Sequence, residues 1–346
     1  MQPAKTIVIG QRGGRYHFLV AKNALLTAGM LTVVLGLLLA CALFFGQSAT
    51  SISELNLVLS GHADRFLTSM VLEWRLPRIV SALVFGAALG VSGALFQSLI
   101  RNPLGSPDII GFNTGAYTGA LVVIIVFGGG YAEIAMGAIG GGVVCAAVVY
   151  FLAWQQGVQG FRLILIGIGV SAMLSAFNSW MMISSNLDTA MTAALWGAGS
   201  LNGMSWAMVL PSFVCITLAL VVAFALSGAL NILEMGDDSA YMLGIDAEQA
   251  RRIAMFVGVV LTAAVTAVTG PIAFIALVAP QLAKKLTGDQ GMALAVPALM
   301  GAILLLAADF IAVNLFAPNQ LPVGMVTLCI GGFYLIYLLI HQSGRG

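Results

Sequence analysis

The chain has 346 residues, of which 60% are hydrophobic and 8% are charged, whereas about a quarter of the residues in an ordinary soluble domain are charged. Such a chain cannot cover itself with a water-compatible surface, which excludes a soluble catalytic domain, and its net charge of +1 offers no basic face for a nucleic acid. Because a membrane-spanning helix needs about 20 apolar residues, the sequence predicts several spans and little else.

The basic segment 1–23 precedes the first long apolar run, and we expect it in the cytoplasm. Residues 24–341 are predicted to form one transmembrane domain, whose first span lies within the uncharged run 23–53. Further spans are expected at 79–100, 109–130, 134–154, 163–183 and 207–233 and, after a polar segment at 230–252, within 253–283, 292–316 and 323–340.

The run 253–283 decides the number of spans. As one helix, its 31 uncharged residues would be about 46 Å long, well beyond the roughly 30 Å of a hydrocarbon core. Gly270-Pro271 marks a turn near its middle, and basic pairs flank the run at 251–252 and 284–285. A helical hairpin with one short arm keeps both pairs in the cytoplasm, so the sequence predicts ten spans and two cytoplasmic termini.

The distribution of lysine and arginine agrees with this even number. Of the 14 basic residues, eleven fall on the predicted cytoplasmic side, and only Arg65, Arg75 and Arg78 fall on the other. Basic residues prefer the cytoplasmic ends of membrane proteins, so this bias supports the predicted orientation.

Sequence motifs for catalysis are missing. No stretch fits G-x-x-x-x-G-K-[ST] or HExxH. Cys41, Cys145, Cys215 and Cys329 stand singly in apolar runs, without the spacing of metal ligands. We therefore expect no enzymatic activity, no metal site and no cofactor bound by this chain. If ATP drives the protein, a separate subunit must bind it.

The polar segment 230–252 predicts a short helix and a turn on the cytoplasmic face. Asp237 or Asp238 can cap the helix, Gly244 can end it in the left-handed conformation, and Asp246 can begin the next helix. Small amphipathic helices of this kind suit docking in a groove on a soluble partner. A solvated loop has the same composition, so the residue types alone leave both interpretations open.

Six motifs, in the same order along the chain, resemble those of the FecCD family of iron-siderophore and cobalamin permeases. They are WRLPR at 74–78, GAALGVSGALFQ at 86–97, RNPLGSP at 101–107, EMGDDSA at 234–240, GPIAFIALVAP at 270–280 and LPVG at 321–324. Within the family, segments 73–78, 112–115 and 196–203 are most similar to permeases for ferric enterobactin.

The resemblance implies an all-α integral membrane protein with ten transmembrane helices and the type II (BtuC-like) ABC importer permease fold, located in the bacterial inner membrane. It implies as partners a second, paralogous permease subunit, two cytoplasmic ATPase subunits that bind ATP and Mg, and a periplasmic siderophore-binding protein. The implied ligand is a ferric siderophore of the catecholate, enterobactin-like kind. Cobalamin or haem is the alternative within the family.

The resemblance also assigns residues to sites. Arg75 and Arg78 correspond to arginines that meet acidic residues of the binding protein, although two arginines can equally anchor the outer end of a span. In the family, the polar loop between the sixth and seventh spans docks on the ATPase. The residues of this loop that we expect to couple to the ATPase are Glu234, Met235, Gly236, Asp237, Asp238, Ala240, Leu243 and Gly244.

Two departures from the family pattern stand out. Relatives commonly carry a histidine after the proline of the short eighth span, where this chain has Gln281. An outer arginine found near the end of span 9 in some relatives is replaced around Val313 and Asn314. The second difference predicts an asymmetric docking surface when the chain pairs with another permease.

The predicted fifth span carries polar residues on one face. Ser171, Ser175, Asn178 and Ser179 are spaced i, i+4, i+7 and i+8, which places them along one side of a helix. The resemblance implies that the fifth and tenth spans line the pore, so these residues are candidates for the translocation path. Small polar residues also serve helix packing, and that alternative stays open.

Asp309 is the one acidic residue deep in a long apolar run. Intramembrane acids are functional candidates, so an ion-coupled secondary transporter that uses Asp309 is the alternative to an ABC permease. The resemblance favours a structural role instead, with Asp309 hydrogen-bonded between helices or near the outer end of span 9.

Overall fold

The computed structural model describes residues 6–9, 18–45, 51–154, 160–288, 293–315 and 317–343. Most of the predicted cytoplasmic segment 1–23 therefore lies outside the described residues, as does Arg345. Two short strands, β1 (Thr6–Ile9) and β2 (Phe18–Ala21), pair antiparallel at the start of the chain. We expected an all-α chain, and this strand pair is an exception that the sequence analysis missed.

Seven helices in the described part of the chain are long and apolar enough to cross a membrane. They comprise α1 (Lys22–Phe44), α4 (Leu76–Ile100), α6 (Tyr131–Ala153), α7 (Gly160–Ser184), α9 (Trp206–Glu234), α11 (Ala247–Thr269) and α13 (Ala295–Asn314). The other helical elements are α2 (Ile52–Leu59), α3 (Arg65–Ser69), η1 (Met70–Arg75), α5 (Phe112–Val122), η2 (Val123–Phe127), α8 (Leu187–Gly197), α10 (Asp237–Met242), α12 (Ile275–Thr287) and α14 (Val323–Ser343). The helical membrane architecture predicted from composition is confirmed.

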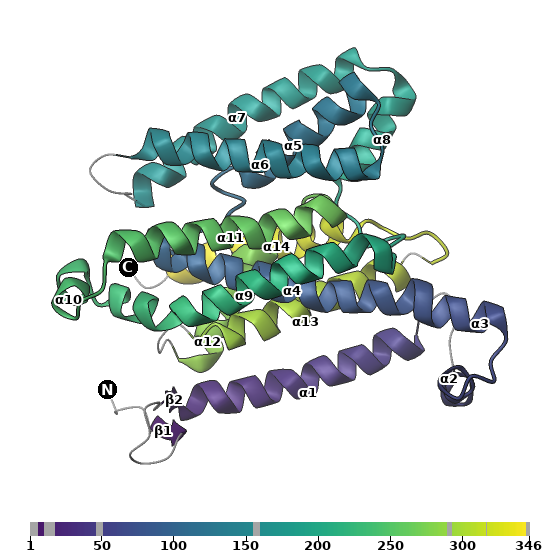
Figure 1. The fold of residues 1–346 in the computed structure, drawn as a ribbon, viewed down its shortest axis with the longest axis horizontal. Helices are drawn as coiled ribbons and strands as arrows, with labels where there is room; N and C mark the ends of the chain where they lie inside the picture. Colours follow the sequence, from purple (N-terminus) through teal and green to yellow (C-terminus); the bar gives the residue numbers. More distant parts are fainter. Residues whose placement is uncertain are drawn as a thin grey trace.

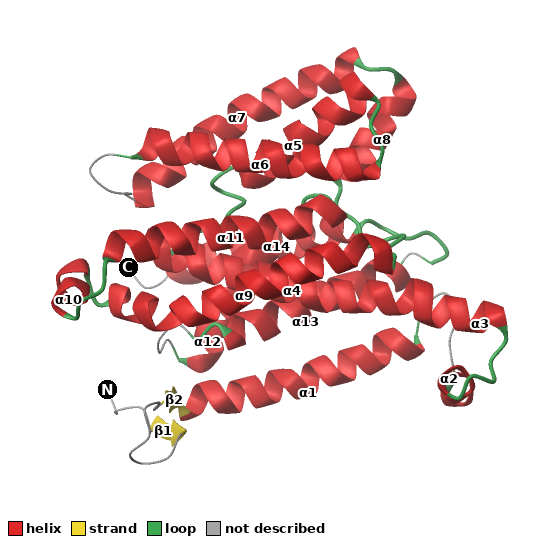
Figure 2. Ribbon diagram, viewed as in Figure 1, coloured by secondary structure: helices red, strands yellow, loops and turns green. Residues whose placement is uncertain are grey.

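The helices form two neighbouring groups (Figure 1). Helices α5, α6, α7 and α8 make one group, and α4, α9 and α11 to α14 make the other, with α1 along its outer side. Nearly all of this architecture is helical (Figure 2). Helices α4 and α11 are the most enclosed, and α11 contacts both α9 and α6, so it joins the two groups.

Close helix packing depends on glycine where α4 meets α13. A Cβ atom at Gly90 would lie 2.1 Å from the carbonyl oxygen of Pro297, and one at Gly301 would lie 2.1 Å from the carbonyl oxygen of Gly86. No side chain fits at such separations, so the backbones touch directly, as small residues permit inside membranes. Glycine at these positions therefore allows α4 and α13 to pack at close range.

The break predicted in the run 253–283 is present. Helix α11 ends at Thr269, Gly270 has a positive φ of 73°, and α12 begins at Ile275 with only 13 residues. Phe274 also has a positive φ, 69°, and its backbone N–H donates to the Asp108 carboxylate at 3.1 Å. That hydrogen bond fixes the turn between the two arms in a conformation that residues with a Cβ seldom adopt.

The first span falls where it was predicted, in the uncharged run 23–53. Helix α1 ends at Phe44, however, and a separate helix, α2, begins after Ser51 at the end of this run. Ser51 and Glu54 form a reciprocal capping box, with Oγ accepting from the Glu54 N–H and the Glu54 carboxylate accepting from the Ser51 N–H. This cap starts a new helix, which an uncharged run does not reveal.

Candidate functional site

The predicted coupling segment forms a compact helix–turn unit at one end of the molecule (Figure 1). Gly236, with φ of 117°, separates α9 from α10, and Gly244, with φ of 76°, follows α10 in the left-handed region. Asp246 caps α11 by accepting hydrogen bonds from the N–H groups of Glu248 and Gln249, both at 3.0 Å. The roles predicted for Gly244 and Asp246 are thus confirmed.

The cap predicted for α10 is wrong. Gly236 is the N-cap and makes no side-chain capping bond, while Asp237 and Asp238 both lie in the first helical turn. The Asp237 carboxylate instead accepts from Arg101 at 2.6 Å and from Arg251 at 2.5 Å. Two guanidinium groups are stronger partners for a carboxylate than a backbone N–H, which explains the difference.

The ion pairs of Asp237 attach α10 to two long helices. Arg101 follows the last residue of α4 in the left-handed conformation, with φ of 51°, and also donates to the Leu233 carbonyl at 3.0 Å. Hydrogen bonds from Arg251, and then from Arg101, lower the pKa of Asp237. A weaker pair, with 3.9 Å between Glu234 and Lys284, joins the last residue of α9 to α12. Through Asp237, α10 is therefore attached to the end of α4 and to α11.

The tip of the coupling segment is apolar and exposed. Tyr241 and Met242 are 83% and 85% exposed, and Met235 and Leu243 are exposed beside them. Ala240 is fully buried, so it anchors α10 and does not belong to this surface. The predicted coupling residues include the exposed Met235 and Leu243 but not Tyr241 and Met242, which are more exposed.

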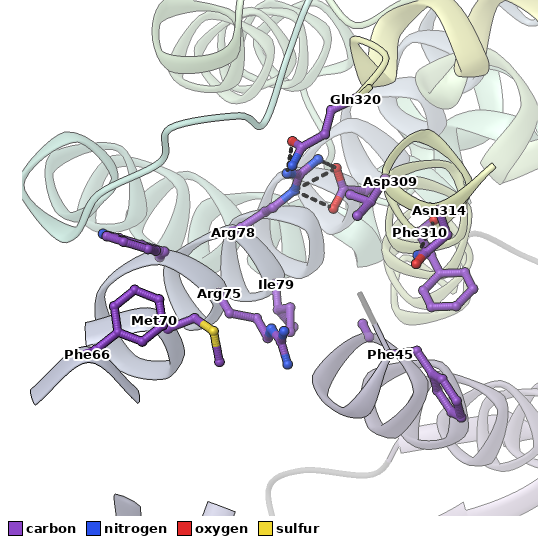
Figure 3. A pocket seen from close by; sticks show the side chains of 13 residues that line it. Phe45, Phe66, Met70, Arg75, Arg78, Ile79, Asp309, Phe310, Asn314 and Gln320 are labelled. Carbon is purple, nitrogen blue, oxygen red and sulfur yellow. Dashed lines mark hydrogen bonds and ion pairs between the residues drawn. The ribbon is translucent and has the colours of Figure 1, made fainter. Parts of the chain in front are cut away.

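Arg78 and Asp309 form an ion pair near the opposite end of the bundle (Figure 3). The Arg78 guanidinium donates to the Asp309 carboxylate through Nε, at 2.9 and 3.1 Å, and through Nη2, at 2.8 Å. Its Nη1 donates to the Gln320 side chain at 2.9 Å. The side chains of Arg78 and Asp309 are 15% and 6% exposed. The expectation that Asp309 forms hydrogen bonds between helices is therefore confirmed.

Arg75 lies beside this pair and points toward α1 (Figure 3). Its Nη1 donates to the Leu43 carbonyl at 2.6 Å, at the C-terminal end of α1, where a cation is favourable. Both arginines border a pocket of about 260 Å³ with aromatic walls that include Phe66 and Trp74. Each arginine thus has partners inside the chain, and the docking role of Arg75 and Arg78 stays a prediction.

The polar face of the fifth predicted span borders a groove of about 650 Å³. Asn178 is 4% exposed, and within the described part of the chain its Oδ1 atom has no hydrogen-bond partner. Ser171 lies nearer the start of α7, against the backbone of Gly111, and does not line the groove. The polar residues that line the groove are Ser175, Asn178 and Ser179 of α7 and Asn113, Thr114 and Tyr117 of α5.

Sequence reasoning missed the contribution of α5 to this groove. Asn113 donates to the Asp108 carboxylate at 2.5 Å, and Asp108 also receives the N–H of Phe274. The groove is thus connected to the turn between α11 and α12. The apolar run 109–130 predicts the helix, and the motif at 112–115 indicates the family resemblance, but neither places Asn113, Thr114 and Tyr117 on the groove.

Gln281, which replaces the family histidine, has two partners. Its Nε2 donates to the Pro103 carbonyl at 2.6 Å, and its Oε1 accepts from the Tyr334 hydroxyl at 3.3 Å. The amide therefore joins α12 to the segment after α4 and to α14. A neutral donor and acceptor can hold these three elements together without an imidazole.

Comparisons with known proteins agree with this geometry. The model of the FecCD transport family matches residues 31–341. The ferric enterobactin transport system permease protein FepG of Escherichia coli (strain K12) is 54% identical over 300 residues, which cover 87% of this chain and 91% of that protein. The iron(3+)-hydroxamate import system permease protein FhuG of Bacillus subtilis (strain 168) is 37% identical over 79% of this chain and 84% of that protein.

A solved structure has the same fold. A chain of a metal-chelate type ABC transporter in an inward-facing conformation superimposes with a TM-score of 0.80 at 28% identity, covering 91% of this chain and 98% of that one. Residues 31–341, which the family model matches, include the coupling segment, the Arg78–Asp309 pair and the polar groove. The chain belongs to the FecCD transport family.

Proposed function

We propose that this chain is the membrane-spanning permease subunit of an ABC importer that carries a ferric siderophore of the enterobactin kind from the periplasm to the cytoplasm. The observation that carries the proposal is the coupling segment, in a chain that is 54% identical to the FepG permease. It presents an exposed apolar tip and attaches it, through Asp237, to α4 and α11. A soluble partner that moves this tip can therefore move the bundle.

The proposed membrane topology has ten spans. To the seven long apolar helices it adds α14 and two shorter spans, α5 with η2 and α12. With ten spans both termini are cytoplasmic, and α10 lies on the cytoplasmic face with Arg101, Arg251 and Lys284. The positive-inside rule supports this orientation.

The proposed assembly contains partners that supply what this chain does not. Two ATPase subunits bind ATP and Mg and dock on α10, a second and paralogous permease completes the pore, and a periplasmic protein delivers the ferric siderophore. Arg75 and Arg78 are the proposed docking residues on the outer face. Because Arg78 is already paired with Asp309, an approaching acidic residue would have to compete with that carboxylate.

We propose that the groove between α7 and α5 is this chain's half of the translocation path, and that the second permease supplies the other half. Its polar groups are uncharged, so they can offer hydrogen bonds to a hydrated anionic chelate without holding it tightly. Among the residues that the structure describes, Oδ1 of Asn178 has no hydrogen-bond partner, which supports this role, since a buried polar atom without a partner is costly unless something hydrogen-bonds to it in use.

A secondary transporter driven by ions through Asp309 is less consistent with the structure. Asp309 is neutralised by a bidentate contact with Arg78, the arrangement expected of a structural ion pair between α4 and α13. Cobalamin or haem permeases share the family, so the ligand has to be tested directly.

The proposal is tested by uptake of radiolabelled ferric enterobactin into cells that lack this chain and into cells complemented with it. We expect uptake only in the complemented cells, and none of it with an Asp237→Arg variant. Ferric hydroxamates, haem and cobalamin serve as the comparison panel. The substrate would be reassigned if cells that lack the chain took up ferric enterobactin as well as the complemented cells do, but failed to take up another ligand of the panel.

A further inference from the structure

A second cavity lies at the end of the molecule that carries α10, between the two groups of helices. It has a volume of about 240 Å³ and is bordered by the last turns of α4 and α6 and the first turns of α7 and α11. Ile100, Tyr150, Leu163 and Arg251 mark these four helix ends. The cavity therefore opens at one surface of the membrane and between helices.

The inner wall of this cavity is apolar. Phe96 is 1% exposed and Leu163 is 2% exposed, and Leu99 and Met255 complete the wall. Apolar side chains at this position offer no hydrogen bonds to a nucleotide or to another polar solute. They fit the glycerol-proximal part of an acyl chain.

The rim of the cavity is basic. Asp237 lines it but is already shared by Arg101 and Arg251, so its charge is more than balanced. Arg252 is exposed and lies, with Glu248, close enough to the Tyr150 hydroxyl to interact electrostatically. The ionised groups on and beside the rim are four guanidinium groups, of Arg101, Arg162, Arg251 and Arg252, and two carboxylates, of Asp237 and Glu248.

From this combination we propose that the cavity binds the phosphate headgroup of an anionic phospholipid, with Arg252 and Arg251 facing the phosphate and Phe96 and Leu99 the acyl chains. Basic pockets between helices near the cytoplasmic surface bind acidic lipid headgroups by the same chemistry. A free phosphate compound would not require the apolar wall. The inference depends on the chain being embedded in a membrane and not on the identity of the siderophore.

A lipid bound in this cavity would lie next to the contact that attaches α10 to α11. Arg251 is shared between the cavity and the Asp237 carboxylate that attaches α10. A phosphate at Arg251 and Arg252 therefore lies next to the linkage between α10 and α11. We expect the bound lipid to hold the first turn of α11 in place while α10 moves.

Native mass spectrometry of the full chain in detergent tests the site, with phosphatidylglycerol as the probe. Phosphatidylcholine, whose zwitterionic headgroup has no net charge, and glycerol 3-phosphate, which has no acyl chains, are the comparisons. We expect retention of phosphatidylglycerol alone. Arg252→Gln should lower its occupancy about fivefold, the effect of removing one arginine near an acidic lipid surface. Leu99→Trp, which fills the apolar wall and keeps every charge, should abolish retention.

Matched controls separate binding from folding. Val148→Trp introduces the same side chain on an exposed part of α6, and Arg65→Gln removes an exposed arginine at the other end of the molecule. Both should retain phosphatidylglycerol as the unmodified chain does. If Arg252→Gln fails to fold, Leu99→Trp and the comparison of phosphatidylglycerol with phosphatidylcholine still test the proposal.

Three outcomes would overturn the proposal: equal retention of phosphatidylcholine, displacement of phosphatidylglycerol by glycerol 3-phosphate, or unchanged occupancy in both Arg252→Gln and Leu99→Trp. The first would indicate a non-selective annular lipid, and the second a site for free phosphate compounds. Ferric enterobactin uptake measured in parallel keeps a failure of the lipid site distinct from a failure of the transport proposal.

Discussion

Arg78 on α4 holds Asp309 on α13 through two of its nitrogens, with contacts of 2.8 and 2.9 Å, and both side chains are almost closed to solvent. The same two helices meet where the backbone at Gly90 touches Pro297. One ion pair and close glycine contacts thus hold α4 against α13, and Arg101, at the end of α4, links this pair of helices to α10.

Asp309→Asn should destabilise the chain because it leaves the Arg78 guanidinium buried without its counter-charge. Breaking a buried pair by removing one partner costs about 3–5 kcal/mol. Thermal unfolding in detergent measures the change, and the double variant Arg78→Gln with Asp309→Asn should lose less than the sum of the single changes. An unchanged melting temperature for Asp309→Asn would contradict the structural role.

Gly90→Ala should destabilise the packing of α4 against α13. The added methyl would overlap the Pro297 carbonyl, and overpacking of this kind costs about 1–3 kcal/mol. Gly140→Ala is the matched control, because a Cβ there meets no atom within 4 Å. Unfolding temperatures should fall for the first variant and stay level or rise for the second, and equal behaviour would refute the close approach.

Asp237→Asn should uncouple α10 from α4 and α11 while the chain still assembles. Loss of the carboxylate charge weakens the contacts with Arg101 and Arg251, so ATP-dependent uptake should fall several-fold. Asp238→Asn, in the same helical turn, is the control, since Asp238 is outside this cluster. Comparable loss in both variants would mean that acidity of the loop matters and that the arginine contacts do not.

The Asp237 carboxylate should make the stability of the folded chain depend on pH. Its pKa is lowered in the folded chain, chiefly by the hydrogen bond from Arg251. Its contribution to folding is therefore fully present above the ordinary carboxyl pKa and is lost as pH falls through the lowered value. The stability difference between the unmodified chain and Asp237→Asn should shrink over that acid range. A difference that grows toward acid pH would contradict a stabilising contribution from the ionised carboxylate.

Asn178→Ala tests the groove. Because Oδ1 of Asn178 has no partner in the described chain, removing the amide should change the unfolding temperature little. Uptake of ferric enterobactin should nevertheless fall, since the groove loses a hydrogen-bonding group. Ser227→Ala on α9, where the hydroxyl is bonded to its own helix at Phe224, is the control. Normal uptake by Asn178→Ala would remove this residue from the path.

Helix positions followed from the sequence because apolar runs and charge bias determine membrane topology. The break at Gly270 could be predicted, since an unbroken run exceeds the membrane thickness. The end of α1 and the start of α2 could not, because a capping box at Ser51 and Glu54 interrupts the apolar region without adding basic charge.

The site was predictable only where a residue acts within its own segment. Gly244 and Asp246 end and begin helices, and both predictions held. Asp237 failed as a cap because its partners, Arg101 and Arg251, are 136 and 14 residues away and only tertiary packing brings them together. The pairing of Asp309 with Arg78 was hidden for the same reason.

The most direct test of the permease role is reconstitution in proteoliposomes of the purified chain, with and without its co-purified permease and ATPase subunits, followed by uptake of radiolabelled ferric enterobactin. We predict uptake that requires the ATPase, ATP and an intact Asp237, and none by the chain alone. Uptake by the chain alone that follows an imposed proton gradient and stops with Asp309→Asn would contradict the permease role.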